Sequence, residues 1–395
     1  MIKNITFFCL LIISTTISCQ EHTRKIGRII TGAEQISSYD SLIAGKKVGL
    51  VVNQSSIINH TLLPDSLLAL GINIRIIFSP EHGFGGAGDA GEYMQDEEYK
   101  DTGIKIISLY GRKKKPAGED LSDLDILMYD IQDVGVRFYT YISTLHYAME
   151  SCAESDIPLL VLDRPNPNGF YVDGPVLKPE YKSFLGMHPL PVVYGLTAGE
   201  LATMINGEKW LKEGEQCRLT VIRCKNYTHK DYYNLPVNPS PNLKSMKAVY
   251  LYPTLGLFTG TVMSMGRGTD FPFLVIGHPD YPDHTFSYNP LPKSGARNPK
   301  YNGETCYGLD LRNEPVDSIR HSEKIDIEFF QMIYNKMNMG TDFFNSSFNY
   351  HAGNNELRRQ ILNDLPADTI RKSWEPALGQ YKKTRKKYLL YPDFE

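Results

Sequence analysis

The sequence of 395 residues has few features that would support metal binding or disulfide bonding. Its six cysteines form no CxxC pair and no Cys/His spacing typical of a metal site. Cys217 and Cys224 flank an apolar run, and on one strand they would lie roughly 23 Å apart at about 3.3 Å per residue, too far for a disulfide. We therefore expect structural cysteines and no metal.

Long apolar runs, an excess of charge and a serine-hydrolase motif are also missing. After the N-terminal segment no apolar stretch is long enough for a membrane helix. The formal net charge of −3 argues against nucleic-acid binding driven by bulk charge, and the basic run 382–387 fits a solvated helix face. No GxSxG elbow is present, which argues against a Ser-His-Asp hydrolase.

The N-terminus has the pattern of a secretory signal. Lys3 precedes the apolar run 5–13, and small polar residues follow up to Cys19. The ending at Cys19 resembles a relaxed bacterial lipobox, in which the cysteine is lipidated after cleavage; an ordinary signal peptide with an incidental cysteine is the alternative. We expect a signal at 1–19, a tether at 20–28, and an exported protein in the periplasm or anchored to the outer membrane by lipid.

Repeated units of apolar run, polar loop and helical pattern follow the tether. Short continuous apolar runs separated by helices are typical of a parallel sheet that is buried on both faces. This pattern predicts an α/β fold, with a Rossmann-like doubly wound domain over residues 29–245. The expected strands are 47–53, 74–78, 104–109, 124–129, 158–162 and 219–223, and the expected helices are 62–70, 143–154 and 197–206.

The composition changes near residue 255, where Gly/Thr-rich loops begin, and the stretch 280–320 is rich in Pro, Asn and Tyr. Helical patterns return at 327–337, 355–365 and 367–383. We therefore expect a second, smaller α+β domain over 246–395, which completes a cleft with the first.

Polar residues end five of the predicted strands: Asn53, Glu81, Tyr110, Asp130 and Asp163. Parallel strands bring these ends to one rim, where open α/β sheets have their functional crevice. The alternative is that strand ends are polar because loops are polar.

Glu81 is the leading catalytic candidate, because it ends an apolar strand and precedes His82 and a flexible loop with four glycines in six residues. Residues 83–88 formally match GxGxxG, but an acidic segment follows in place of the helix that would hold a pyrophosphate. We therefore expect no nucleotide cofactor, and expect the glycines to let the backbone approach a ligand.

Glycoside cleavage commonly needs two carboxyl groups, one acidic and one acting as nucleophile or base. Glu81 is our choice for the acid. Asp130 is our choice for the second carboxylate, and Asp133 is the other option. Arginine forks recognise carboxylates, so an anionic substrate is expected. Each of these residues also has a structural alternative, such as a cap, an ion pair or a turn. The expected substrate-binding residues are Asn53, His82, Arg137, Tyr139, Arg164, Asn166, Asn242 and Arg267.

Several motifs resemble those of the bacterial exo-β-N-acetylmuramidases, a family long known only as a domain of unknown function. They are SPEHGFGG (79–86), SLYG (108–111), DIQDVGVRFYTY (130–141), LDRPNPNG (162–169), NGE (206–208), PSPN (239–242) and GRGTD (266–270). The resemblance covers nearly the whole mature chain. It implies a Rossmann-like domain with a smaller C-terminal domain, Glu81 as the catalytic residue, and release of N-acetylmuramic acid from non-reducing ends of peptidoglycan fragments.

Thr259 departs from the family pattern, which usually has an acid at this position, and no basic residue follows Phe84. Two alternatives therefore remain at this stage. One is a non-catalytic muropeptide-binding lipoprotein, and the other is an exo-glycosidase of another hexosamine.

Overall fold

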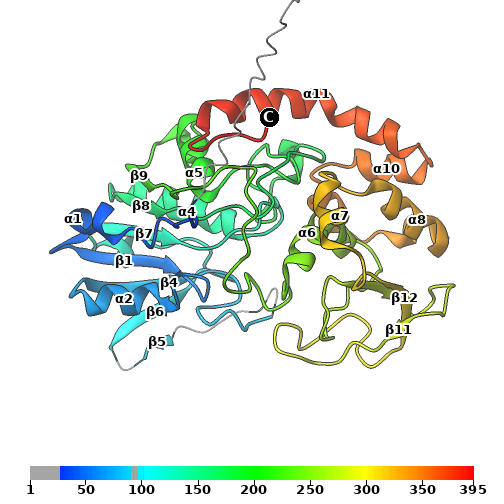
Figure 1. The fold of residues 1–395 in the computed structure, drawn as a ribbon, viewed down its shortest axis with the longest axis horizontal. Coiled ribbons are helices and arrows are strands. Elements are labelled where there is room, and N and C mark those ends of the chain that lie inside the picture. The colour runs from blue at the N-terminus through cyan, green and yellow to red at the C-terminus, as the bar shows by residue number, and fades with distance from the viewer. Residues whose placement is uncertain (1–26, 90–91, 93–96, 101) are drawn as a thin grey trace, which may run out of the picture.

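A computed structural model describes residues 27–89, 92, 97–100 and 102–395 of the chain (Figure 1). The predicted signal, with Cys19, and all but the last two residues of the predicted tether lie outside the described residues. Within the described part, no helix is long and apolar enough to span a bilayer.

The central sheet has seven strands and all except the edge strand β5 are parallel. The parallel strands have the order 3-2-1-4-5-6 when numbered along the chain, which is the order of the Rossmann fold. All six predicted strands are present. In spatial order the sheet is β5 (Glu97–Tyr99), β6 (Ile104–Ser108), β4 (Asn73–Ser79), β1 (Lys47–Val52), β7 (Ile126–Asp130), β8 (Leu159–Leu162) and β9 (Leu219–Ile222).

Helices cover both faces of this sheet because the strands are apolar on both sides. Leu50 of β1 packs in a core with α1 (Asp40–Ile43) and α2 (Leu63–Ala69). The next residue, Val51, points to the other face, where α4 (Tyr141–Glu154) and α5 (Ala198–Gly207) pack. The doubly wound architecture is therefore confirmed.

Helix α5 begins at the capping box that the sequence predicts. The Thr197 side chain accepts a hydrogen bond from the Glu200 backbone N–H at 3.2 Å, and Glu200 Oε2 accepts from the Thr197 N–H at 2.9 Å. The remaining elements of this half are β2 (Ile57–Ile58), β3 (Thr61–Leu62), α3 (Gly118–Leu121) and the 3₁₀ turns Ile36–Ser38, Pro179–Tyr181 and Lys212–Gly214.

The C-terminal part begins with α6 (Met246–Leu255) and contains a small antiparallel sheet in the order β10-β12-β11. The sheet agrees with the α+β class that we expected for this part, although its individual strands were not placed, because they are short and lie in loops rich in Pro, Asn and Tyr. The predicted helices are present. The elements are β10 (Val275–His278), β11 (Ser287–Tyr288), β12 (Cys306–Asp310), α7 (Val316–His321), α8 (Ile327–Met337), α9 (Phe348–Ala352), α10 (Glu356–Leu362), α11 (Ala367–Arg385) and 3₁₀ turns at Gly256–Gly260, Gly340–Phe343 and Lys386–Tyr388.

The two parts share one hydrophobic core. Buried residues of β7 and α4 belong to the same cluster as Phe330 of α8 and Trp374 of α11. In Figure 1, α11 runs along the upper edge of the molecule from the sheet half to α10. The small C-terminal part is therefore held firmly beside the carboxyl ends of the parallel strands.

Candidate active site

Glu81 and Tyr110 follow two neighbouring parallel strands, β4 and β6, and both line a cavity of about 360 Å³. The C-terminal part closes the cavity with residues of α6 and of the loops around it. The cavity is therefore lined by residues from both parts of the chain. Its lining residues are Glu81, His82, Tyr110, Lys114, Phe138, Tyr139, Thr140, Tyr141, Phe184, Leu185, Ser240, Asn242, Leu243, Tyr252, Thr259, Arg267, Phe273 and His351.

Glu81 is the one carboxylate that lines this cavity among the described residues. Its Oε2 accepts a hydrogen bond from Thr140 Oγ1 at 2.5 Å, and its side chain also bonds to Tyr110. Burial raises the pKa of Tyr110, and the neighbouring Glu81 raises it further, so the phenol stays protonated and donates. Two hydroxyl groups therefore fix the carboxylate that the sequence singled out.

Two tyrosines attach the polar loop 237–242 to the rim of the sheet. The Tyr139 hydroxyl donates to the Pro239 carbonyl at 2.7 Å, and the Tyr141 hydroxyl donates to the same oxygen at 3.2 Å. Their rings pack edge to face with centroids 4.7 Å apart. These contacts place Asn242 on the cavity wall, where its Nδ2 donates to Gly295 O at 2.8 Å.

His82 closes the glycine-rich loop as well as lining the cavity. It has a φ of 73° and its Nδ1 lies 2.7 Å from Gly88 O, and because a carbonyl only accepts, this nitrogen carries the proton. Burial lowers the pKa of His82, so its imidazole is neutral near pH 7. The left-handed backbone at His82 and at Gly83 (φ 73°) turns the chain back toward the strand.

Arg267 provides a cation with unused hydrogen-bonding capacity. Its guanidinium lies 5.3 Å from the centroid of the Phe273 ring, and its buried Nε has no hydrogen-bond partner among the described residues. A second cavity of about 150 Å³ shares Arg267 and Thr259 with the first and is also lined by Lys300. Burial lowers the pKa of Lys300 to about 8, and Arg267 adds to this effect.

Asp130, our expected second carboxylate, lies outside the cavity. It is completely buried and accepts from Arg164 Nε at 2.5 Å and Nη2 at 2.8 Å. Arg164 also donates to Ile57 O at 3.0 Å. Two residues that we expected to act on a substrate therefore neutralise each other beneath the rim.

Arg137 is likewise a structural residue in this fold. Its Nη1 donates to Pro175 O and Leu190 O, both at 2.7 Å, and its Nη2 donates to His351 O at 2.8 Å. Burial lowers the pKa of Arg137 to about 9. It does not reach the cavity, but it positions His351, which does.

Asn53 and Asn166 also lie outside the cavity. The Asn53 Oδ1 accepts from the Ser55 N–H at 3.0 Å and from its hydroxyl at 2.6 Å. The Asn166 Oδ1 accepts from the Asn168 N–H at 2.8 Å, and its Nδ2 donates to Leu196 O at 2.8 Å. Both are turn-forming residues, which was the alternative interpretation.

The structure thus brings together Glu81, His82, Tyr139, Asn242 and Arg267 from our expected set. Sequence reasoning missed Thr140 and Tyr110 as partners of Glu81, although both lie in motifs that we quoted. It missed His351 entirely, because a residue in α9 has no local signal that links it to a strand end 270 positions earlier.

A carboxylate fixed by two hydroxyls, aromatic cavity walls and a nearby arginine are features of an enzyme site that can carry out acid–base chemistry on a ligand with a negative charge. The described residues contain no group of three or more His, Cys, Asp or Glu arranged to hold a metal ion.

Comparisons with known proteins agree with this class. The models of the exo-β-N-acetylmuramidase NamZ N-terminal and C-terminal domains match residues 48–247 and 250–391. A peptidoglycan β-N-acetylmuramidase NamZ of Bacillus subtilis is 38% identical over 394 residues, with 94% of each chain covered. The chain therefore belongs to the exo-β-N-acetylmuramidase NamZ family and is a glycoside hydrolase, as the motifs predicted.

Two crystal structures of DUF1343 family proteins from Bacteroides fragilis share the fold. One is 42% identical with a TM-score of 0.85, covering 93% of this chain and 99% of the other. The second is 29% identical with a TM-score of 0.75, covering 92% and 99%. The relation therefore extends over both parts of the molecule.

Proposed function

We propose that this hydrolase acts on peptidoglycan fragments and releases N-acetylmuramic acid from their non-reducing ends, with Glu81 as the general acid. The observation that carries the proposal is the Glu81 carboxylate, fixed by Thr140 at 2.5 Å in a cavity that also contains Arg267. The cavity volume of about 360 Å³ lies near the lower end of the usual range for ligand sites, about 300–1,000 Å³, and suits one substituted sugar.

In this proposal the Glu81 carboxyl group transfers its proton to the glycosidic oxygen while the bond from that oxygen to the anomeric carbon breaks. The hydroxyls of Thr140 and Tyr110 hold the carboxyl group in one orientation, so less reorganisation is needed in the transition state. A water oxygen then bonds to the anomeric carbon, and its released proton restores Glu81.

Arg267 is our candidate for the lactyl carboxylate of the muramic acid. Its buried Nε has no partner in the part of the chain that the structure describes, and a carboxylate would complete its hydrogen bonding. This interaction would distinguish N-acetylmuramic acid from N-acetylglucosamine, which has no lactyl group. An unpaired buried donor is costly, so the sugar without the carboxylate would bind less well.

The test uses chromogenic β-glycosides of both sugars. Wild-type protein should release the chromophore from the muramic-acid glycoside and much more slowly from the N-acetylglucosamine glycoside. Glu81→Gln should lower kcat/KM by about 10²- to 10⁴-fold, the usual contribution of a general acid. Glu375→Gln, on the exposed side of α11, is the matched control and should have no effect. Wild-type turnover by Glu81→Gln would reject the assignment, and equal rates on both sugars would reject the specificity.

Export with a lipid anchor on Cys19 is the second part of the proposal. The support comes from the sequence alone, namely the apolar run 5–13 and the lipobox-like ending at Cys19. Wild-type protein should sediment with membranes and take up labelled palmitate. Cys19→Ala should do neither, and equal labelling of the two forms would exclude the anchor.

A further inference from the structure

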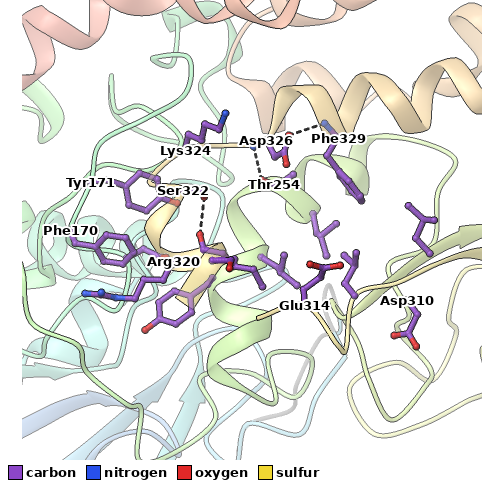
Figure 2. A pocket seen from close by; sticks show the side chains of 18 residues that line it. Phe170, Tyr171, Thr254, Asp310, Glu314, Arg320, Ser322, Lys324, Asp326 and Phe329 are labelled. Atoms are coloured by element: carbon purple, nitrogen blue, oxygen red, sulfur yellow. Dashed lines mark hydrogen bonds between the residues drawn. The ribbon is translucent and has the colours of Figure 1, made fainter. Parts of the chain in front are cut away.

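A larger cavity, of about 460 Å³, also has residues of α6 in its wall (Figure 2). Tyr252 of α6 lines the Glu81 cavity, whereas Tyr250 and Leu251 line the second one, and none of the described residues lines both. The other walls come from the loop after β8, from β12, from α7 and from the start of α8. The proposed reaction leaves this cavity without a role.

The floor of the cavity is apolar and aromatic. Phe170, Tyr171 and Tyr250 lie on one side, and Leu255 and Leu309 complete the surface. Aromatic and aliphatic surfaces of this kind bind the side chains and backbone planes of small ligands. This apolar surface alone does not indicate which ligand binds, but the charged side chains around it do.

Two cationic side chains lie beside the aromatic side of the cavity. The Arg320 guanidinium lies 4.6 Å from the Phe170 ring centroid, its Nη2 donates to Lys230 O at 3.2 Å, and its buried Nε has no hydrogen-bond partner among the described residues. Lys324 lies on the same side in Figure 2, and its ion pair with Glu328 is long, at 3.9 Å. Asp326 lies near Lys324 in Figure 2, so the unpaired Nε of Arg320 is the donor on this side that an anion would engage.

Three carboxylates line the cavity, and two of them, Glu314 and Asp310, lie away from these cations in Figure 2. Asp310 is neutralised by Arg312, which donates to it from Nε at 2.8 Å and from Nη2 at 2.7 Å. Glu314 has no ion-pair partner among the described residues. The opposite side of the cavity therefore offers one available anion to a ligand amino group.

We propose that this cavity binds a short peptide branch of peptidoglycan, with a peptide carboxylate beside Arg320 and Lys324 and a peptide amino group beside Glu314. A peptide that carries both charges fits this arrangement over an apolar floor, whereas a neutral sugar would offer no charged group to Arg320 Nε or to Glu314. No bond is made or broken here. The site holds the enzyme on its polymer, and the inference rests on the proposed function for the identity of that polymer.

The experiment measures binding of the tripeptide L-Ala-γ-D-Glu-L-Lys to the mature protein by calorimetry. Wild type should show saturable binding with one site. The double variant Glu314→Gln/Lys324→Met should bind the tripeptide at least about tenfold more weakly, because two charge-assisted contacts are lost. Both residues are exposed, so the fold should tolerate the change. The matched control, Glu375→Gln/Lys372→Met on α11, should bind as wild type does.

Two comparison ligands show which chemistry is recognised. The same tripeptide with blocked amino and carboxyl groups, and the neutral sugar chitotriose, should both bind much more weakly. Absence of saturable tripeptide binding, equal binding by the cavity variant, or tighter binding of chitotriose would each overturn the inference. Hydrolysis of the chromogenic muramic-acid glycoside is measured in parallel and should be unchanged in all variants. If wild type fails to hydrolyse that glycoside, the proposed function fails, and the peptide-binding result is still decisive for this cavity.

Discussion

Replacing Asp130 with asparagine tests whether this carboxylate serves stability or catalysis. Asp130 is completely buried, and Arg164, which is 3% exposed, bonds to it through two nitrogens. The neutral amide would leave the buried guanidinium without its counter-charge, which typically costs about 3–5 kcal/mol. For a folded chain of this size that corresponds to a fall in Tm of roughly 4–6 °C.

Thermal unfolding followed by circular dichroism measures this change, and activity is measured well below Tm. Asp130→Asn should unfold earlier while its kcat/KM on the chromogenic glycoside stays within about twofold of wild type. The double variant Asp130→Asn/Arg164→Met should recover part of the stability, because both buried charges are then absent. An Asp130→Asn protein with wild-type Tm and a hundredfold lower kcat would refute the reasoning and restore Asp130 to the reaction.

Three further predictions concern the two cavities near Glu81 and the buried core. Arg267→Met should raise KM for the muramic-acid glycoside about tenfold or more and reduce the preference over N-acetylglucosamine, and an unchanged ratio of the two kcat/KM values would contradict its role. Thr259→Glu should also raise KM, because a carboxylate beside Arg267 competes with that of the substrate; Thr259→Gln is the neutral control. Burial raises the pKa of Asp133 to about 7, so its protonated form is favoured by folding, and this stabilisation is lost as pH rises through about 7. Asp133→Asn should therefore flatten the decline in the free energy of unfolding between about pH 4 and 7, as urea titrations can show, and an identical slope in both proteins would contradict it.

The sheet was predictable from sequence because parallel strands buried on both faces have apolar runs that stand out from the loops around them. The capped start of α5 and the helices of the C-terminal part were predictable for the same kind of local reason. The strands β10 to β12 were not, because they are short and their partners lie far away in the chain.

Motifs surround Glu81 and Arg267, but they also surround Asp130, Arg137 and Arg164, which therefore looked equally functional. An acid or an arginine at the end of a strand has the same sequence appearance whether it faces a cavity or a buried partner. The two Nη atoms of Arg137 donate to backbone carbonyls of Pro175, Leu190 and His351, which are contributed by segments that local patterns do not connect.

The sequence by itself determined the strand and helix order, the position of Glu81 at the end of β4 and, through its motifs, the family. Only the tertiary structure decided which polar groups face the cavity. That choice depends on which charges meet across long chain separations, as Arg164 meets Asp130 and Thr140 meets Glu81, and on how burial changes the cost of leaving each of them unpaired.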